Sequence, residues 1–146
     1  HLIRRVQVSA MLRPPNGQDP NDPGSQNRFS ALRQFEILTC QRTSAVRCDT
    51  PAQFTTIYTS PPDAFPSIAP RPRAPELITR SFRVPATKAT FVQLRVLTNQ
   101  CTGAPDYQGE QDNDPLNDTD CDEAVVTITS PQDQIVRAAE LQVFSN

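Results

Sequence analysis

Hydrophobic and polar residues alternate in several short stretches of this chain, and alternation with a period of two is typical of half-buried β-strands. In residues 3–12, IRRVQVSAML, every second residue from Val6 to Ala10 is apolar. The polar residues between them, including Gln7 and Ser9, are expected to face the opposite side. The same analysis predicts further strands at residues 33–40, 54–60, 77–84, 90–98, 123–129 and 138–144.

The most regular of these patterns are the predicted second and fifth strands. Phe35 and Ile37 are expected on the buried face of the former, while Val92, Leu94 and Val96 alternate strictly in the latter. Fifteen prolines against four glycines favour short strands joined by stiff loops, because proline disrupts helix interiors and central strands. Without a convincing amphipathic helix, the pattern predicts an all-β fold, an antiparallel β-sandwich or jelly roll. An immunoglobulin-type sandwich is the main alternative, but the chain has no Trp for that fold's characteristic core.

The chain of 146 residues fits one domain, so we expect residues 1–146 to form a single β-sandwich. The net charge of −2 gives no overall attraction for nucleic acid, and no partner of that kind is predicted. The longest apolar run falls short of the ~20 residues that span a bilayer, so no membrane span is expected. His1 opens directly into a strand, which suggests a fragment of a longer secreted precursor.

Four cysteines allow three disulfide pairings. The simplest joins Cys40 to Cys48 and Cys101 to Cys121, each pair closing a loop between predicted strands. A zinc site is the rival use, but the chain lacks a CxxC pair and has one histidine only. Disulfides are favoured, and they predict a secreted, extracellular protein.

Residues 101–123 are the most acidic part of the chain. They hold eight of its sixteen carboxylates, and no Lys or Arg lies between Arg95 and Arg137. Calcium takes six to eight oxygen ligands from carboxylates, carbonyls and waters. The candidate calcium ligands are Asp112, Asp114, Asp118 and Asp120.

Two other interpretations of the acidic segment stay open. Its carboxylates are either solvated or paired with arginines on or beside the strands. The candidate arginines are Arg28, Arg33, Arg80 and Arg95, with Glu110 or Asp112 as their partners. A glycosylation sequon at Asn117 is equally consistent with chance in a segment of this composition.

Catalytic motifs are missing from the sequence. The chain has no HExxH, and Ser9, Ser30 and Ser60 have neither a GxSxG context nor an internal histidine base apart from His1. We therefore expect that this chain is not an enzyme.

Several segments resemble a known family. VQVSAML, QNRFSALRQFEILTC, FTTIYTSP, FVQLRVLTNQC and RAAELQVF resemble strands of a galactose-binding-like, discoidin-type jelly roll. NQCTGAPDYQGEQDNDPLNDTDC, together with RAAELQVF, is similar to the C-terminal domain of bacterial fungalysin-type extracellular metallopeptidases. The chain departs from the discoidin pattern by starting at a strand that would follow the usual first strand and calcium loop. Of the family's calcium site, only Glu140 has a counterpart here.

The resemblance implies a non-catalytic accessory domain of a secreted metallopeptidase. Such jelly rolls bind ligands through loops at one end, and the expected ligand is an extracellular glycan or protein substrate. The residues selected for ligand contact are Tyr107, Arg28, Asn27 and Gln108, with Phe65 and Tyr58 as further candidates. Each of the three aromatic residues, Tyr107 included, fits core or loop packing better than ligand contact. The alternative is a structural module that completes a processed multichain assembly, where its partner is the parent enzyme or another chain. A third hypothesis is a piece of a nicked enzyme that acts in maturation.

Overall fold

The chain forms two antiparallel β-sheets of three strands each, which confirms the predicted all-β sandwich. The computed structural model describes residues 1–11, 31–66, 77–105, 136 and 138–145. The strands within these residues are β1 (Leu2–Met11), β2 (Leu32–Cys40), β3 (Thr55–Thr59), β4 (Leu77–Lys88), β5 (Phe91–Asn99) and β6 (Ala138–Phe144). The strand predicted at residues 123–129 lies outside the described residues.

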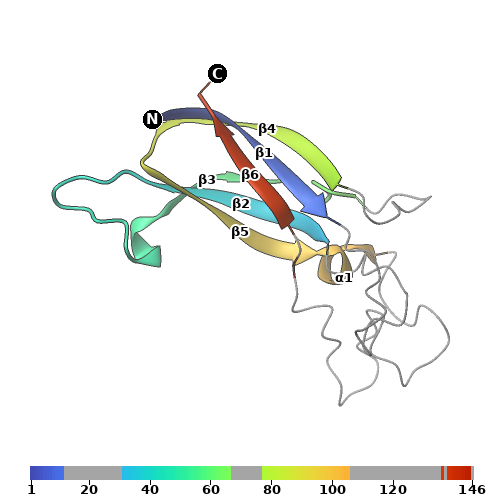
Figure 1. The fold of residues 1–146 in the computed structure, drawn as a ribbon. Helices are drawn as coiled ribbons and strands as arrows, with labels where there is room; N and C mark the ends of the chain where they lie inside the picture. The colour runs from blue at the N-terminus through green and yellow to red at the C-terminus, as the bar shows by residue number, and fades with distance from the viewer. Residues whose placement is uncertain (12–30, 67–76, 106–135, 137, 146) are drawn as a thin grey trace, which may run out of the picture.

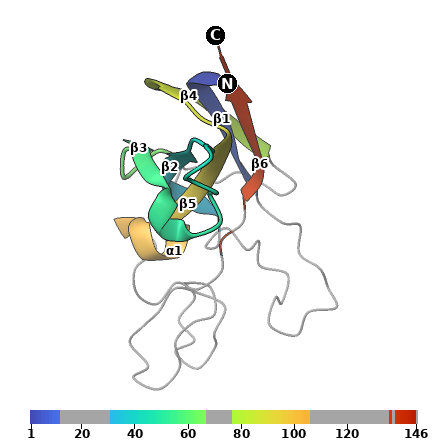
Figure 2. The ribbon, with the colours of Figure 1, turned by 90° about the vertical axis from the view of Figure 1, so that its left-hand side faces the viewer.

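The strand order is β4-β1-β6 in one sheet and β3-β2-β5 in the other (Figure 1). The chain changes sheet between β1 and β2, between β3 and β4, between β4 and β5, and between β5 and β6. Figure 2 shows the two sheets as separate layers. Because the two middle strands β1 and β2 lie in different layers, the core forms between them.

The passage from β4 to β5 is a corner of two residues. The amide of Ala89 still donates to His1 O at the start of β1 (2.9 Å), and its carbonyl accepts from the amino group of His1 (2.9 Å). The next amide, that of Thr90, donates to Cys40 O at the end of β2 (3.0 Å). Consecutive residues therefore bond to different sheets, and strands that switch sheets in this way make the corners of a β-sandwich.

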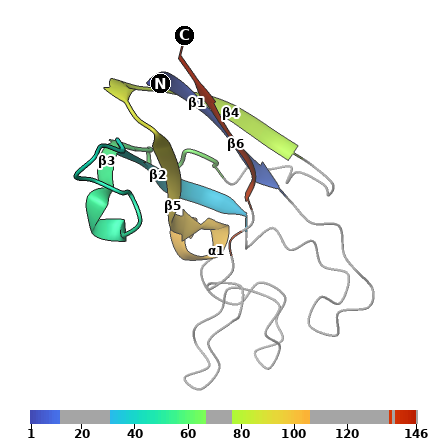
Figure 3. The same ribbon diagram turned by 60° about the vertical axis from the view of Figure 1, so that its left-hand side comes forward.

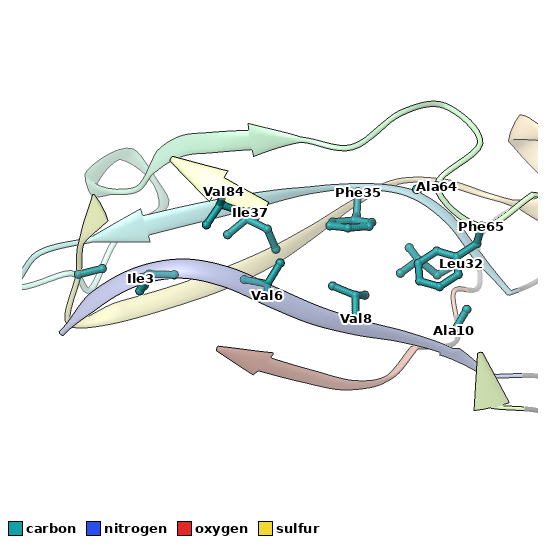
Figure 4. Close-up of a cluster of buried hydrophobic side chains, with 11 residues drawn as sticks. Ile3, Val6, Val8, Ala10, Leu32, Phe35, Ile37, Ala64, Phe65 and Val84 are labelled. Carbon is teal, nitrogen blue, oxygen red and sulfur yellow. The ribbon is translucent and has the colours of Figure 1, made fainter. Parts of the chain in front are cut away.

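The core lies where β1 faces β2, as the alternation predicted. Val6 and Val8 point from β1 toward Phe35 and Ile37 of β2, and all four side chains are completely buried (Figure 4). Full burial of an aliphatic or aromatic side chain contributes about 1.5–3 kcal/mol to folding. This pair of alternating strands is therefore a main source of the fold's stability.

An aromatic cluster closes the sandwich between β3 and β4. The ring of Phe35 packs edge-on against Phe82 of β4 with centroids 5.0 Å apart, and it also contacts Tyr58 of β3 and Phe65. Tyr58 and Phe82 contact each other across the two sheets. Phe65 is therefore buried and Tyr58 partly buried in this cluster, in agreement with their interpretation as packing residues.

Four local features differ from the sequence prediction. β4 does not end at Val84 but continues to Lys88, because Pro85 lies in a bulge of an edge strand where its missing N–H costs no sheet hydrogen bond. A short helix, α1 (Gln100–Gly103), follows β5, and a 3-10 turn, η1 (Pro51–Gln53), precedes β3. Ser9, expected on the exposed side, is buried because Thr79 and Glu140 flank it on the neighbouring strands.

The core-facing side chains of β5 and β6 are more exposed to solvent than those of β1 and β2. Val143 pairs with Val6 and so faces the core side of its sheet, yet it is 41% exposed while Val6 is completely buried. The inward residues of β5, such as Leu94, are only half-buried. Each of these two strands has one hydrogen-bonded neighbour among the described residues.

Candidate functional site: the loop end of the sandwich

One end of the sandwich carries the described residues that border the three undescribed segments. In the first sheet, the last residue of β1, Met11, pairs with Leu77 at the start of β4, and Ala10 pairs with Ala138 at the start of β6. Figure 1 shows these strand ends on the same side of the molecule. We call this end, with α1, the loop end.

The second sheet contributes to the same end. Leu32, the first residue of β2, pairs with Asn99, the last residue of β5. Phe65 is bound alongside, because its amide donates to Arg33 O over 3.2 Å. Segments 12–30, 67–76 and 106–135 therefore all leave and rejoin the described structure at the loop end.

Gln100, the first residue of α1, connects the parts of the loop end. It is 6% exposed, and its amide donates to Ala31 O over 2.9 Å. Its side-chain Nε2 donates to the carbonyl oxygens of Phe65 and Leu32. One side chain therefore links β2, the chain after β3, and the segment after β5, which makes the loop end a rigid frame.

Arg33 is the buried cation of the loop end. It occupies a bulge of β2, since β2 advances two residues from Leu32 to Gln34 while β5 advances one. Bulges redirect side chains, and this one is followed by a hydrogen bond from Arg33 Nη1 to Gln100 Oε1 (3.0 Å). The side chain is 7% exposed and its Nε lacks a hydrogen-bond partner. Within the described part of the chain, no carboxylate forms an ion pair with it.

The turn of α1 is fixed by its cap and its glycine. Asn99 Oδ1 accepts from the amide of Thr102 (2.8 Å), and Thr102 Oγ1 accepts from the amide of Asn99 (3.1 Å). A Cβ atom added to Gly103 would lie 2.7 Å from Thr98 Oγ1 and 2.8 Å from Arg33 Cδ. Only glycine lets α1 approach Arg33 this closely. Sequence reasoning missed this turn, although Asn99 with Thr102 three residues later is a capping signal.

The predicted disulfides have separate outcomes. Cys40 and Cys48 form a disulfide, as predicted. Cys101, buried in α1, is also disulfide-bonded, whereas its predicted partner Cys121 lies outside the described residues.

Most of the predicted ligand and calcium residues are not described. These residues are Asn27, Arg28, Tyr107, Gln108, Asp112, Asp114, Asp118 and Asp120. Glu140 is described: it lies exposed on β6 opposite Ser9, and its Oε1 accepts from Gln142 Nε2 over 2.8 Å. Within the described ranges, no three acidic, cysteine or histidine residues gather as a metal site would need.

Two of the strand arginines have partners among the described residues. Arg95 Nε donates to Glu36 Oε2 over 2.7 Å, across β5 and β2, and Arg80 Nη1 donates to Ala64 O. The hydrogen bond from Arg95 lowers the pKa of Glu36 below its ordinary value of 4.5. Burial raises the pKa of Tyr58. Whether Glu110 or Asp112 also meets an arginine falls outside the described residues.

Of the three serines considered for catalysis, Ser60 and Ser9 have structural partners, and Ser30 lies outside the described residues. Ser60 Oγ accepts from the amide of Phe35 (3.0 Å) and donates to Pro61 O, and Ser9 Oγ bonds with Thr79 Oγ1 (3.0 Å). At the loop end, the chemistry available in the described residues is hydrogen bonding and positive charge from Arg33.

Comparison with known proteins gave no match: no family model, no curated protein and no solved structure is similar to this chain. In the described part of the chain, none of the helices has the length and apolar character needed to cross a lipid bilayer.

Proposed function

We propose that this chain is a non-catalytic accessory domain of a secreted enzyme that binds an extracellular glycan or protein substrate at the loop end. The observation that carries the proposal is the convergence of three chain segments on one end of a rigid two-sheet frame. Binding residues commonly lie on loops that a rigid scaffold positions. Gln100 and Arg33 supply that rigidity by joining β2, α1 and Phe65.

The extracellular setting rests on the disulfide between Cys40 and Cys48, since such bonds persist in oxidising compartments. The resemblance of residues 99–121 to fungalysin-type metallopeptidases suggests the parent enzyme, and it suggests a galactose-binding-like jelly roll as the finer fold. Calcium held by the acidic segment is part of the proposal, as a structural ion. A rise in melting temperature with millimolar calcium, absent for magnesium at equal concentration, would support it; no shift would remove calcium from the proposal.

The test of the loop-end site uses immobilised neutral polysaccharides and fibrillar collagen as ligands. The variants Arg28→Ala and Tyr107→Ala change residues of two segments that join the frame at the loop end. Each should weaken binding about tenfold, the loss expected when one good contact is removed. The control variant Arg47→Ala removes an exposed arginine of the Cys40–Cys48 loop and should bind as the wild type does. No binding of the wild type to any of these ligands would reject the proposal.

A second function is favoured by the open side of the sandwich. Val143 is 41% exposed although it faces the core side of its sheet, and the edges of β5 and β6 have no strand paired to them in the described part. A strand from another chain can pair with such an edge. The chain would then be a structural module of a processed multichain assembly. Copurification from the native source in a complex of fixed stoichiometry would favour this function over the first.

A further inference from the structure

The outer face of the sheet β4-β1-β6 carries two arginines that lie directly opposite each other. Arg5 of β1 pairs with Arg83 of β4 in the strand register. Both face away from the core, since Val6 and Phe82, the next pair along, point inward. Like charges directly opposite each other on neighbouring strands destabilise a sheet.

Arg5 and Arg83 are not neutralised within the described part of the chain. The ion pairs found there join Arg95 to Glu36 and Arg47 to Asp49. Arg5 is also incompletely hydrogen-bonded: its Nε is buried without a partner. In the other sheet, the arginine on the outer face lies opposite an acidic residue: Arg95 of β5 pairs with Glu36 of β2. Arg5, by contrast, lies opposite a second arginine.

Phe144 of β6 fixes the orientation of Arg5. Phe144 pairs with Arg5 in the register of β6 with β1, on the edge of β1 opposite to β4. The guanidinium carbon of Arg5 lies 4.3 Å from the centre of the Phe144 ring. A guanidinium held over an aromatic face is attracted to it and is partly desolvated. Among the described residues, no carboxylate forms an ion pair with this guanidinium.

The rest of this face is polar, and β6 adds Gln142 and Glu140 to it. Two cross-strand pairs lie between Arg5 and the loop end: Gln7 Nε2 donates to Ser81 Oγ (2.9 Å), and Ser9 Oγ, which is buried, bonds with the exposed Thr79 at its Oγ1 (3.0 Å). In the strand order β4-β1-β6, these pairs join β1 to β4, which are drawn as neighbouring strands in Figure 3. Hydroxyl and amide groups in such pairs suit the hydroxyl groups of sugars.

We propose that Arg5 and Arg83 bind the sulfate or carboxylate group of an acidic polysaccharide, which lies across the outer face of this sheet. The two guanidinium groups supply the charge-assisted hydrogen bonds, and Gln7 and Ser81 contact the neighbouring sugar. The polar, hydrogen-bonding surface argues for a sugar chain rather than for a membrane, which would require exposed apolar residues. Nucleic acid is a competing ligand, and duplex DNA tests it in the experiment below.

This site is separate from the loop end, because Arg5 lies near the start of β1 and the loop end lies at its last residue, Met11. The proposal can therefore fail while the loop-end function stands, and the reverse also holds. Loss of binding in Arg28→Ala or Tyr107→Ala alone would point to the loop end, whereas loss in Arg5 or Arg83 variants alone would point to this face.

The experiment measures binding of the full chain to heparin and polygalacturonate, with dextran and duplex DNA as comparisons. Heparin tests sulfate as the ligand group and polygalacturonate tests carboxylate. Arg83→Gln and Arg5→Gln should each weaken binding at least about tenfold, because charge-assisted hydrogen bonds are roughly twice as strong as neutral ones. Arg47→Gln, which also removes one exposed positive charge, should bind as the wild type does. Binding should weaken as salt is added.

A stability measurement separates a binding role from a structural one. Without ligand, Arg83→Gln should have a melting temperature equal to or above that of the wild type, because it removes a like-charge contact. With heparin or polygalacturonate, the wild type should be stabilised and the variant should not. The proposal is overturned if neither acidic polysaccharide binds, if dextran or DNA binds as tightly, or if both arginine variants retain full affinity.

Discussion

Arg33 Nη1 donates a hydrogen bond to Gln100 Oε1 over 3.0 Å in the interior of the loop end. A buried guanidinium therefore has a neutral amide as its partner among the described residues, rather than a carboxylate. Because Gln100 also binds the carbonyls of Phe65 and Leu32, its amide group connects the cation to the backbone of two other segments. Gln100 therefore joins β2, α1 and the chain at Phe65 through its side chain.

Replacement of Gln100 by Ala should destabilise the fold by about 1–3 kcal/mol or more, because it leaves buried hydrogen-bonding groups and a buried charge without partners. Chemical denaturation measures the loss. Gln93→Ala is the matched control, since Gln93 is exposed on the neighbouring strand β5, and it should change stability by less than about 0.5 kcal/mol. Equal stability of the two variants would contradict the role of Gln100.

Gly103→Ala should be destabilising although alanine is the better helix former. Its methyl group would approach Thr98 Oγ1 to 2.7 Å and Arg33 Cδ to 2.8 Å, so α1 must move away from the arginine. Overpacking of this kind costs about 1–3 kcal/mol. The larger side chain in Gly103→Val should cost more than the methyl group, and urea midpoints of the two variants test that order. An alanine variant as stable as the wild type would show that the turn has room.

Phe35→Ala should remove about 3–5 kcal/mol of stability, because Phe35 is completely buried and contacts three other aromatic rings. Phe91→Ala provides a control of identical chemistry: Phe91 is 41% exposed on β5, and its loss should cost far less. Comparable losses for both variants in thermal or urea denaturation would show that the core is not centred on Phe35.

The sequence predicts the strands well because alternation marks both the strand and its buried face. Val6, Val8, Phe35 and Ile37 were expected inside and are completely buried. The turn of α1 was missed because four residues are too few for a helical period to show. The strand predicted at residues 77–84 stops before Pro85, but pairing with β1 extends β4 beyond this proline.

Partners across strands could not be predicted in the same way, because they depend on register. The register of β2 and β5 places Glu36 opposite Arg95. Pairing of an arginine with Glu110 or Asp112, one of the open interpretations, stays a prediction, because both residues lie outside the described part of the chain. The side chain of Arg33 likewise bonds to Gln100 because β2 has a bulge at this position, and the sequence pattern does not predict that bulge. Local sequence patterns predict which face of a strand a residue lies on. The partner of its side chain depends on how the strands pair within the assembled sheets.

The pair formed by Glu36 and Arg95 should make stability depend on pH. The hydrogen bond from Arg95 lowers the pKa of Glu36 in the folded state, so folding favours the ionised carboxylate. Its contribution is fully present above the ordinary pKa of 4.5 and is lost as the pH falls through the lowered value. The difference in urea midpoint between the wild type and Glu36→Gln should therefore shrink as the pH is lowered from 6 toward 3. In an Arg95→Ala background the same comparison should show little dependence on pH; an unchanged dependence would assign the effect to another group.

The Cys40–Cys48 disulfide should stabilise the chain only moderately, because two effects oppose each other. Closing a loop with a sequence separation of eight restricts the unfolded chain, which contributes about 2–3 kcal/mol. Cys48, however, has a φ of 61°, and a left-handed conformation costs a residue with a side chain roughly 1–2 kcal/mol. The double variant Cys40→Ser with Cys48→Ser should therefore lose about 1–2 kcal/mol, measured by denaturation without reductant. Ala45→Ser, an exposed change in the same loop, is the control and should leave stability unchanged. A loss much above this range would show that the bond also holds β2 against the corner at Thr90, whose amide donates to Cys40 O.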